Sequence, residues 1–216
     1  QRRLWVLDQM EEGLTAYNMP AAIRIEGGLD VEALEKAFEN LINRHEILRT
    51  RFVEEEDGEP RQVIAPAAAF QLPRIDWRDK EPAETKAYLQ AHANQVFDLR
   101  EGPLLKAELL HTGEGSHILL LNMHHIISDG WSMEVLLREL SALYDAAAKG
   151  EGNPLPALKI QYKDYAAWQG ELLSDNERMA ELRGYWRAQL ADLPVLELPA
   201  DYPRPSVKSY RGGRLH

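Results

Sequence analysis

The sequence contains no cysteine, which excludes a disulfide framework and a thiol nucleophile supplied by the chain itself. Basic residues are also scarce: 25 lysines and arginines stand against 35 aspartates and glutamates, for a net charge of −10. Such a chain lacks the basic surface that nucleic-acid binding requires. No apolar run approaches membrane-spanning length, and no segment resembles a signal peptide. These absences predict a cytoplasmic protein that binds neither nucleic acid nor membranes. Any thiol that takes part in its chemistry must be supplied by a partner.

The 216 residues are enough for one substantial core or a large lobe. The sequence begins at Gln1 instead of a methionine, and it ends soon after Arg211-Gly212-Gly213, where a new strand is expected to begin. We interpret it as part of a longer polypeptide. The proline-rich stretch 193–209 that precedes this end favours an extended strap between lobes.

One stretch concentrates the residues able to carry chemistry. The apolar run Ile118–Leu121 predicts a buried strand, and the periodic run Met133–Ala148 predicts an amphipathic helix. The connection between them contains His124 and His125. Because side chains alternate along a strand, these two imidazoles should point in opposite directions, so that only one faces a given cleft. The start of the following helix places backbone N–H donors near a possible base. A base beside donors that can stabilise an oxyanion is an arrangement suited to acyl transfer.

Two other interpretations of these histidines remain open at this point. A histidine at a strand end is often only a structural hydrogen-bonding residue. A metal site is the second alternative, because His125 and Asp129 are four residues apart and a hairpin could bring His111 and His117 to one end of a sheet. Against a metal, no third ligand has motif spacing and cysteine is absent.

Arg44 and Arg49 lie in an otherwise apolar stretch, where an unpaired guanidinium would be costly. We expect an acidic partner, and Asp129 is the leading candidate. The hypothesis is a charge-assisted pair, formed by Arg49 in preference to Arg44, that makes Asp129 structural. The alternative is that both arginines are surface charges.

The remaining periodicity predicts irregularly alternating helices and strands. Asp30 is a predicted N-cap, and the acidic residues of the helix that follows, Glu32 among them, should face solvent. The predicted helices are 1–10, one with apolar residues spaced from Val31 to Ile42, 82–97, 131–150, 160–173 and 175–190. Residues 44–52 are predicted to lead from the second of these helices into a strand, and the other predicted strands are 22–26, 61–64, 70–77, 104–110 and 118–123, with hairpins at 53–60 and 112–116. This order favours an α/β fold, a mixed-sheet two-layer sandwich, over a doubly wound parallel fold.

Four motifs resemble those of nonribosomal peptide synthetase condensation domains. HHIISDG at 124–130 fits the family signature HHxxxDG. QRRLWVL at 1–7 resembles the end of the first family motif, RHEILRTRF at 44–52 the second, and YKDYAAWQ at 162–169 the fourth. They occur in the family order along the whole chain. Val6 departs from the usual phenylalanine, which affects packing and not chemistry.

The resemblance implies a chloramphenicol-acetyltransferase-like lobe, with residues 1–192 as the N-terminal lobe and 193–216 as an extended crossover toward a missing C-terminal lobe. It implies an active site in a tunnel between lobes, in which His125 is the catalytic base or positioning residue and His124 supports it from the other side. Under the pairing hypothesis above, Asp129 with Arg49 or Arg44 supports the same site. Gly130 could present an N–H to the oxyanion.

The implied reaction joins donor and acceptor substrates held as thioesters on the phosphopantetheine arms of carrier proteins, with no cofactor or metal bound directly. An adenylation domain would adjoin it in the parent synthetase. Residues 17–20 and 124–132 most resemble the subtype that joins an L-donor to an L-acceptor, and this fragment alone is expected to be inactive. The alternatives are an epimerization domain, a coenzyme A-dependent acyltransferase, and a non-catalytic lobe that docks carrier proteins.

Overall fold

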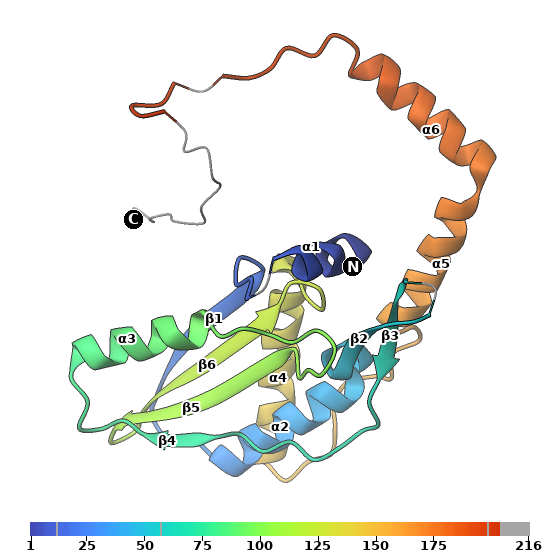
Figure 1. Ribbon diagram of the computed structural model, residues 1–216. Helices are drawn as coiled ribbons and strands as arrows, with labels where there is room; N and C mark the ends of the chain where they lie inside the picture. Colours follow the sequence, from blue (N-terminus) through green and yellow to red (C-terminus); the bar gives the residue numbers. More distant parts are fainter. Residues whose placement is uncertain (12, 57, 198, 204–216) are drawn as a thin grey trace. The chain divides into compact units, whose positions relative to one another are not determined.

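The computed structural model describes residues 1–11, 13–56, 58–197 and 199–203 (Figure 1). The chain divides into two units, residues 1–163 and residues 164–216. This division precedes the boundary expected after residue 192, and the assignment of 1–192 to a single lobe stays a prediction. The strand expected to begin after Arg211-Gly212-Gly213, like much of the predicted crossover, lies outside the described residues.

A four-stranded mixed sheet forms the centre of the first unit. Its order is β1-β6-β5-β4, with bounds Asn18–Glu26, Ser116–His124, Leu105–Gly113 and Arg74–Asp76. β6 is antiparallel to both β1 and β5, whereas β4 is parallel to β5. The predicted hairpin and the predicted mixed sheet are therefore confirmed. β4 is shorter than the strand expected over 70–77, since only three residues pair with β5.

Helices α2 and α4 cover one face of this sheet, and their bounds are Val31–Arg44 and Gly130–Ala148 (Figure 1). Alternate strand residues point into the layer, as the pleat requires. The resulting core joins Phe38 and Leu41 of α2 with Leu140 and Leu143 of α4, and its buried strand residues are Leu105, Ala107, Leu109, Leu119, Leu121 and Met123. This packing fixes α4, and hence the turn that precedes it, against the sheet.

Helix α3, residues Pro82–Ala93, packs on β1 and β6, from which two asparagines reach its C-terminal end. The side-chain amide of Asn122 donates to the carbonyls of His92 and Ala93 at 2.8 and 3.2 Å. Asn18 donates to the carbonyls of Ala93 and Gln95. Because the last carbonyls of a helix have no partner within it, these amides close the helix at Ala93, four residues earlier than the periodicity predicted.

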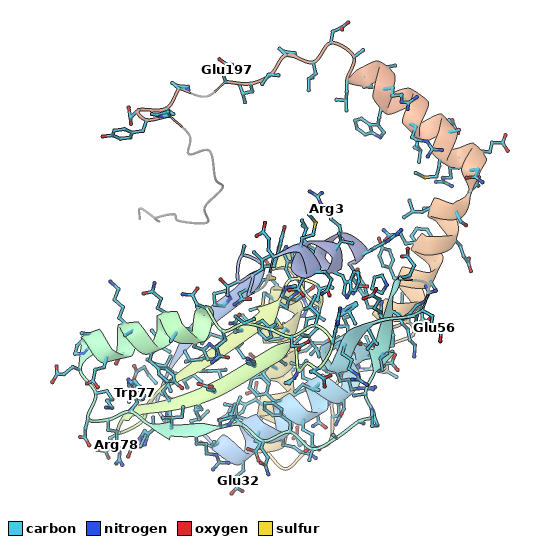
Figure 2. The ribbon with its side chains drawn as sticks, viewed as in Figure 1. Arg3, Glu32, Glu56, Trp77, Arg78 and Glu197 are labelled. Atoms are coloured by element: carbon cyan, nitrogen blue, oxygen red, sulfur yellow. The ribbon has the colours of Figure 1, made fainter. Side chains whose placement is uncertain are left out.

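The start of α2 follows the prediction. The carboxylate of Asp30 accepts a hydrogen bond from the backbone N–H of Ala33 at 2.9 Å, which confirms it as the N-cap. Glu32 in the next turn is exposed and points away from the core (Figure 2). The helix therefore buries one apolar stripe, but the expectation that its acidic residues face solvent holds fully only for Glu32. Glu35 is partly buried and accepts a hydrogen bond from the backbone N–H of Leu72.

A second, two-stranded sheet follows α2. A short 3₁₀ helix, η1 (Glu46–Arg49), leads into β2 (Thr50–Glu54), which pairs antiparallel with β3 (Pro60–Ile64). The hairpin was predicted, although Asp57 of its turn lies outside the described residues. The N-terminal helix α1 spans Arg2–Met10 and buries Trp5 in the main core.

The second unit begins within the predicted helical pair, and both helices are confirmed: α5 spans Tyr162–Ser174 and α6 spans Asn176–Gln189. Neither buries a residue. Trp168, Tyr185 and Trp186, which we expected to pack, are each 56% exposed. The expectation was wrong for the described residues because no neighbouring element of this unit covers these rings. Throughout the part of the chain described, no helix is both long enough and apolar enough to cross a bilayer.

Candidate active site

The candidate site is the segment His124–Asp129, called here the histidine turn, which joins the end of β6 to the start of α4. His124 is the last residue of the strand and is 1% exposed, whereas His125 is exposed. The opposite orientation predicted for the two rings is therefore confirmed. The pleat buries the first imidazole and leaves the second available to a ligand.

The ring of His125 has a defined orientation. Its Nδ1 lies 2.6 Å from the carbonyl oxygen of Ser128, and its backbone N–H donates to the carbonyl of Tyr17 at 2.8 Å. Because a carbonyl oxygen can only accept, Nδ1 must carry the proton of this contact. In the neutral ring Nε2 is then the unprotonated nitrogen, and it can accept a proton. The turn thus presents an exposed imidazole with a fixed tautomer.

His124 supports the turn from beneath. Its Nδ1 accepts a hydrogen bond from the backbone N–H of Ile126 at 3.1 Å, and its ring lies against those of Tyr17 and Phe97. Burial, with a smaller contribution from the charge of His125, lowers the pKa of His124 to about 4. The ring is therefore neutral at neutral pH, and its lone pair fixes the backbone that follows His125.

Asp129 is the N-cap of α4. Its carboxylate accepts hydrogen bonds from the backbone N–H of Ser132 at 2.8 Å and from the Ser132 hydroxyl at 2.6 Å. These two hydrogen bonds are the main reason that the pKa of Asp129 lies below its usual value. The structural role expected for Asp129 has a local basis, because a helix N-terminus supplies unpaired donors within three residues.

The predicted pair between Asp129 and Arg49 or Arg44 is wrong. Arg44 Nε lies 3.0 Å from Oε2 of Glu139 in α4, and Arg49 lies 3.8 Å from Glu46 and donates to the carbonyl of Ala65. Both arginines have an acidic neighbour, as the cost of an isolated buried charge requires, but it is not Asp129. The link between the histidine turn and the motif at 44–52 therefore runs through α4.

Glu139 is the partner that the sequence analysis missed. It also lies 2.7 Å from Nε2 of His45, so that one carboxylate joins α4 to two consecutive residues at the end of α2. Burial favours the protonated form of Glu139, yet hydrogen bonds from His45 and Arg44 hold its pKa below the usual value. A signal was present: Glu139 follows Leu136 by three residues and precedes Leu143 by four, so helical spacing places it on the buried stripe.

Gly130 opens α4 next to the histidine turn. A Cβ added at Gly130 would meet no heavy atom within 4 Å, so the space in front of it is open in the described residues. The next residue, Trp131, is 77% exposed. An exposed imidazole, the N-terminus of a helix and a glycine without a neighbouring side chain therefore adjoin one another in the chain.

The histidines considered as metal ligands do not converge on His125. His111 and His117 pair across the closed end of the β5–β6 hairpin, with ring centroids 4.9 Å apart, whereas His125 follows the opposite end of β6. Within the described ranges no group of three or more histidine, aspartate and glutamate residues is arranged to hold a metal ion.

Comparisons with known proteins identify the family. The chain matches the family described as "Condensation domain" over residues 1–216. It is 46% identical to a linear gramicidin synthase of Brevibacillus parabrevis over 98% of its own length, and 43% identical to a plipastatin synthase of Bacillus subtilis over 100%. It covers only 3% and 6% of these two relatives.

Solved structures show the same fold. The chain superposes on the X-domain from teicoplanin biosynthesis with a TM-score of 0.81 and 32% identity, over 95% of this chain and 45% of that one. The first condensation domain of the CDA synthetase, at 24% identity, gives a TM-score of 0.75 over 89% of this chain and 49% of that one. The chain thus corresponds to about half of each domain.

Proposed function

Because the chain belongs to the condensation domain family of nonribosomal peptide synthetases, we propose that it forms the N-terminal part of a domain that makes an amide bond between two carrier-bound thioesters. The observation that carries the proposal is the exposed His125 ring, whose Nδ1 is held by the Ser128 carbonyl so that Nε2 remains as a proton acceptor.

The reaction needs one bond made and one broken. The nitrogen of the acceptor α-amine attacks the carbonyl carbon of the donor thioester, and the carbonyl electron pair moves to oxygen. Collapse of this adduct breaks the C–S bond and expels the donor thiolate. Nε2 of His125 accepts the proton released by nitrogen and passes it to the sulfur. Since a free α-amine has a pKa of roughly 8, much of it is already neutral near pH 8, and orientation of the amine contributes more than prior deprotonation.

Gly130 has a complementary role in this proposal. The oxyanion formed during attack needs a donor that is already in position, and the backbone N–H groups at the start of α4 are such donors. The open space at Gly130 allows a thioester to approach the backbone closely. His124 and Asp129 act only through the shape of the turn.

The partners follow from the same proposal. Donor and acceptor substrates arrive on the phosphopantetheine arms of carrier proteins, the rest of the domain completes the site, and an adenylation domain adjoins it in a cytoplasmic synthetase. The resemblance of residues 17–20 and 124–132 supports an L-donor and an L-acceptor. The 216-residue chain alone is expected to be inactive, because it supplies about half of the domain.

The test uses the intact domain with a loaded donor carrier and a loaded acceptor carrier. His125→Ala should lower the single-turnover rate of amide formation by about 10²- to 10⁴-fold, whereas His111→Asn, at the hairpin end, should leave it unchanged. A His125→Ala domain that keeps most of its rate would exclude both the base role and the positioning role.

A second candidate is a lobe that docks partner proteins without catalysis. It is favoured by the 33% identity to the teicoplanin X-domain, whose structure was solved in complex with OxyB. The same assay separates the candidates: amide product indicates condensation, loss of α-deuterium indicates epimerization, and dependence on coenzyme A indicates a free acyltransferase. Carrier binding without any of these products indicates a docking lobe.

A further inference from the structure

The side chain of Gln1 links three segments that are far apart in sequence. Its Nε2 donates to the backbone carbonyl of Ile126 in the histidine turn at 2.9 Å. Its Oε1 accepts from Nε2 of Gln62 in β3, also at 2.9 Å. A residue at the start of α1 therefore connects the turn to the β2–β3 hairpin.

The contact falls on the residue that follows His125. Ile126 is held at both of its backbone groups: its N–H donates to Nδ1 of His124 at 3.1 Å, and its carbonyl accepts from Gln1. Ile126 itself is 3% exposed, so water has little access to replace a missing donor. Fixing both peptide planes of Ile126 limits the backbone rotation that would turn the adjacent imidazole.

The carbonyl of Ile126 decides which end of the Gln1 amide faces the turn. Because this carbonyl can only accept, the NH₂ group of Gln1 is directed at Ile126, and the Oε1 of Gln1 accepts from Gln62. Reversing the Gln1 amide would instead place its oxygen against the Ile126 carbonyl and its NH₂ against that of Gln62. The hydrogen-bond network thus requires a side chain that both accepts and donates, which a carboxylate of the same shape cannot do.

We propose that Gln1 is a positioning residue for the condensation reaction: its amide donates to the Ile126 carbonyl and thereby keeps the His125 ring in its reactive orientation. This inference rests on the proposed function, since it assigns the orientation of His125 a role in catalysis. Gln62 acts one step further away, by donating a hydrogen bond to Oε1 of Gln1.

The experiment compares Gln1→Glu and Gln1→Ala in the intact domain with loaded carriers. Glutamate keeps the shape and the acceptor for Gln62 but loses the donor to Ile126. Both variants should lower kcat about tenfold, the value of one lost hydrogen bond to a buried carbonyl, while KM for the acceptor carrier changes less than about twofold. Gln90→Ala, an exposed glutamine of α3, is the matched control and should retain the wild-type kcat.

Two further measurements separate positioning from general stability. In a His125→Ala background, Gln1→Glu should cause no additional loss, because the group that it orients is gone. With ¹⁵N-labelled histidine, the His125 ring signals, assigned by loss in His125→Ala, should shift in Gln1→Glu. A Gln1→Glu domain with wild-type kcat and unchanged His125 signals would overturn the inference. Retained activity in His125→Ala would instead overturn the proposed function.

Discussion

The guanidinium of Arg44 and the carboxylate of Glu139 form an almost buried ion pair between the end of α2 and the middle of α4, with 3.0 Å between Nε and Oε2. Their side chains are only 10% and 11% exposed. Arg44 also donates to the carbonyl of Pro156, and His45 shares the same carboxylate oxygen. The pair therefore fixes the helix that carries Gly130 to its neighbour on the sheet.

Glu139→Ala should destabilise the domain by about 3–5 kcal/mol, because it leaves the Arg44 charge buried without this partner. Chemical denaturation of the intact domain measures this loss, with Glu134→Ala on the exposed side of α4 as control. Replacing Arg44 and Glu139 together by apolar residues should restore much of the stability. A single-variant loss below about 1 kcal/mol would show that the pair is solvated.

Acidification should destabilise the fold through His124. Its pKa of about 4 lies below the ordinary value of 6.5, so between these values the unfolded chain binds a proton that the folded chain does not. The contribution of His124 to the free energy of unfolding is constant above pH 6.5. It falls by up to about 1.4 kcal/mol per pH unit as the pH drops toward 4. His124→Asn should flatten this part of a stability–pH curve, and an unchanged slope would assign the effect elsewhere.

Asp129→Ala should cost about 0.5–2 kcal/mol, the usual value of an N-cap, whereas Asp129→Asn should cost much less because it retains the acceptor. Hydrogen exchange in the first turn of α4 measures the local effect. The losses of unfolding free energy caused by Arg49→Gln and by Asp129→Ala should add in the double variant, since the two residues have different partners. A coupling energy above about 0.5 kcal/mol would restore the discarded pair.

Gly130→Ala should separate folding from chemistry. The added methyl group meets no heavy atom within 4 Å among the described residues outside its own helical turn, and alanine favours a helix more than glycine does, so the free energy of unfolding should not decrease. Amide formation should nevertheless slow at least about tenfold if a thioester must approach this backbone. Denaturation and single-turnover assays on the same preparation test both statements; Gly150→Ala is unsuitable as a control because its φ is +70°.

Much of the fold could be predicted because its periodicities are local. The apolar run Ile118–Leu121 predicted β6, the spacing of Leu136, Leu140 and Leu143 predicted α4, and Asp30 predicted the start of α2. The ends of α3 and β4 could not be predicted. Asn18 and Asn122, from strands distant in sequence, end α3, and the length of β4 is set by the number of residues that pair with β5.

The candidate site shows the same division. Consecutive histidines at a strand end face opposite ways, so the sequence by itself determined that the two rings would point in opposite directions. That His124 is the buried one was decided by the rings of Tyr17 and Phe97, which pack against it. Which partners stabilise the site was decided only by tertiary structure. Asp129 met the donors of its own helix, Arg44 met Glu139, and Gln1 met Ile126, because ion pairs and hydrogen bonds depend on distances in space that sequence spacing does not encode across separate elements.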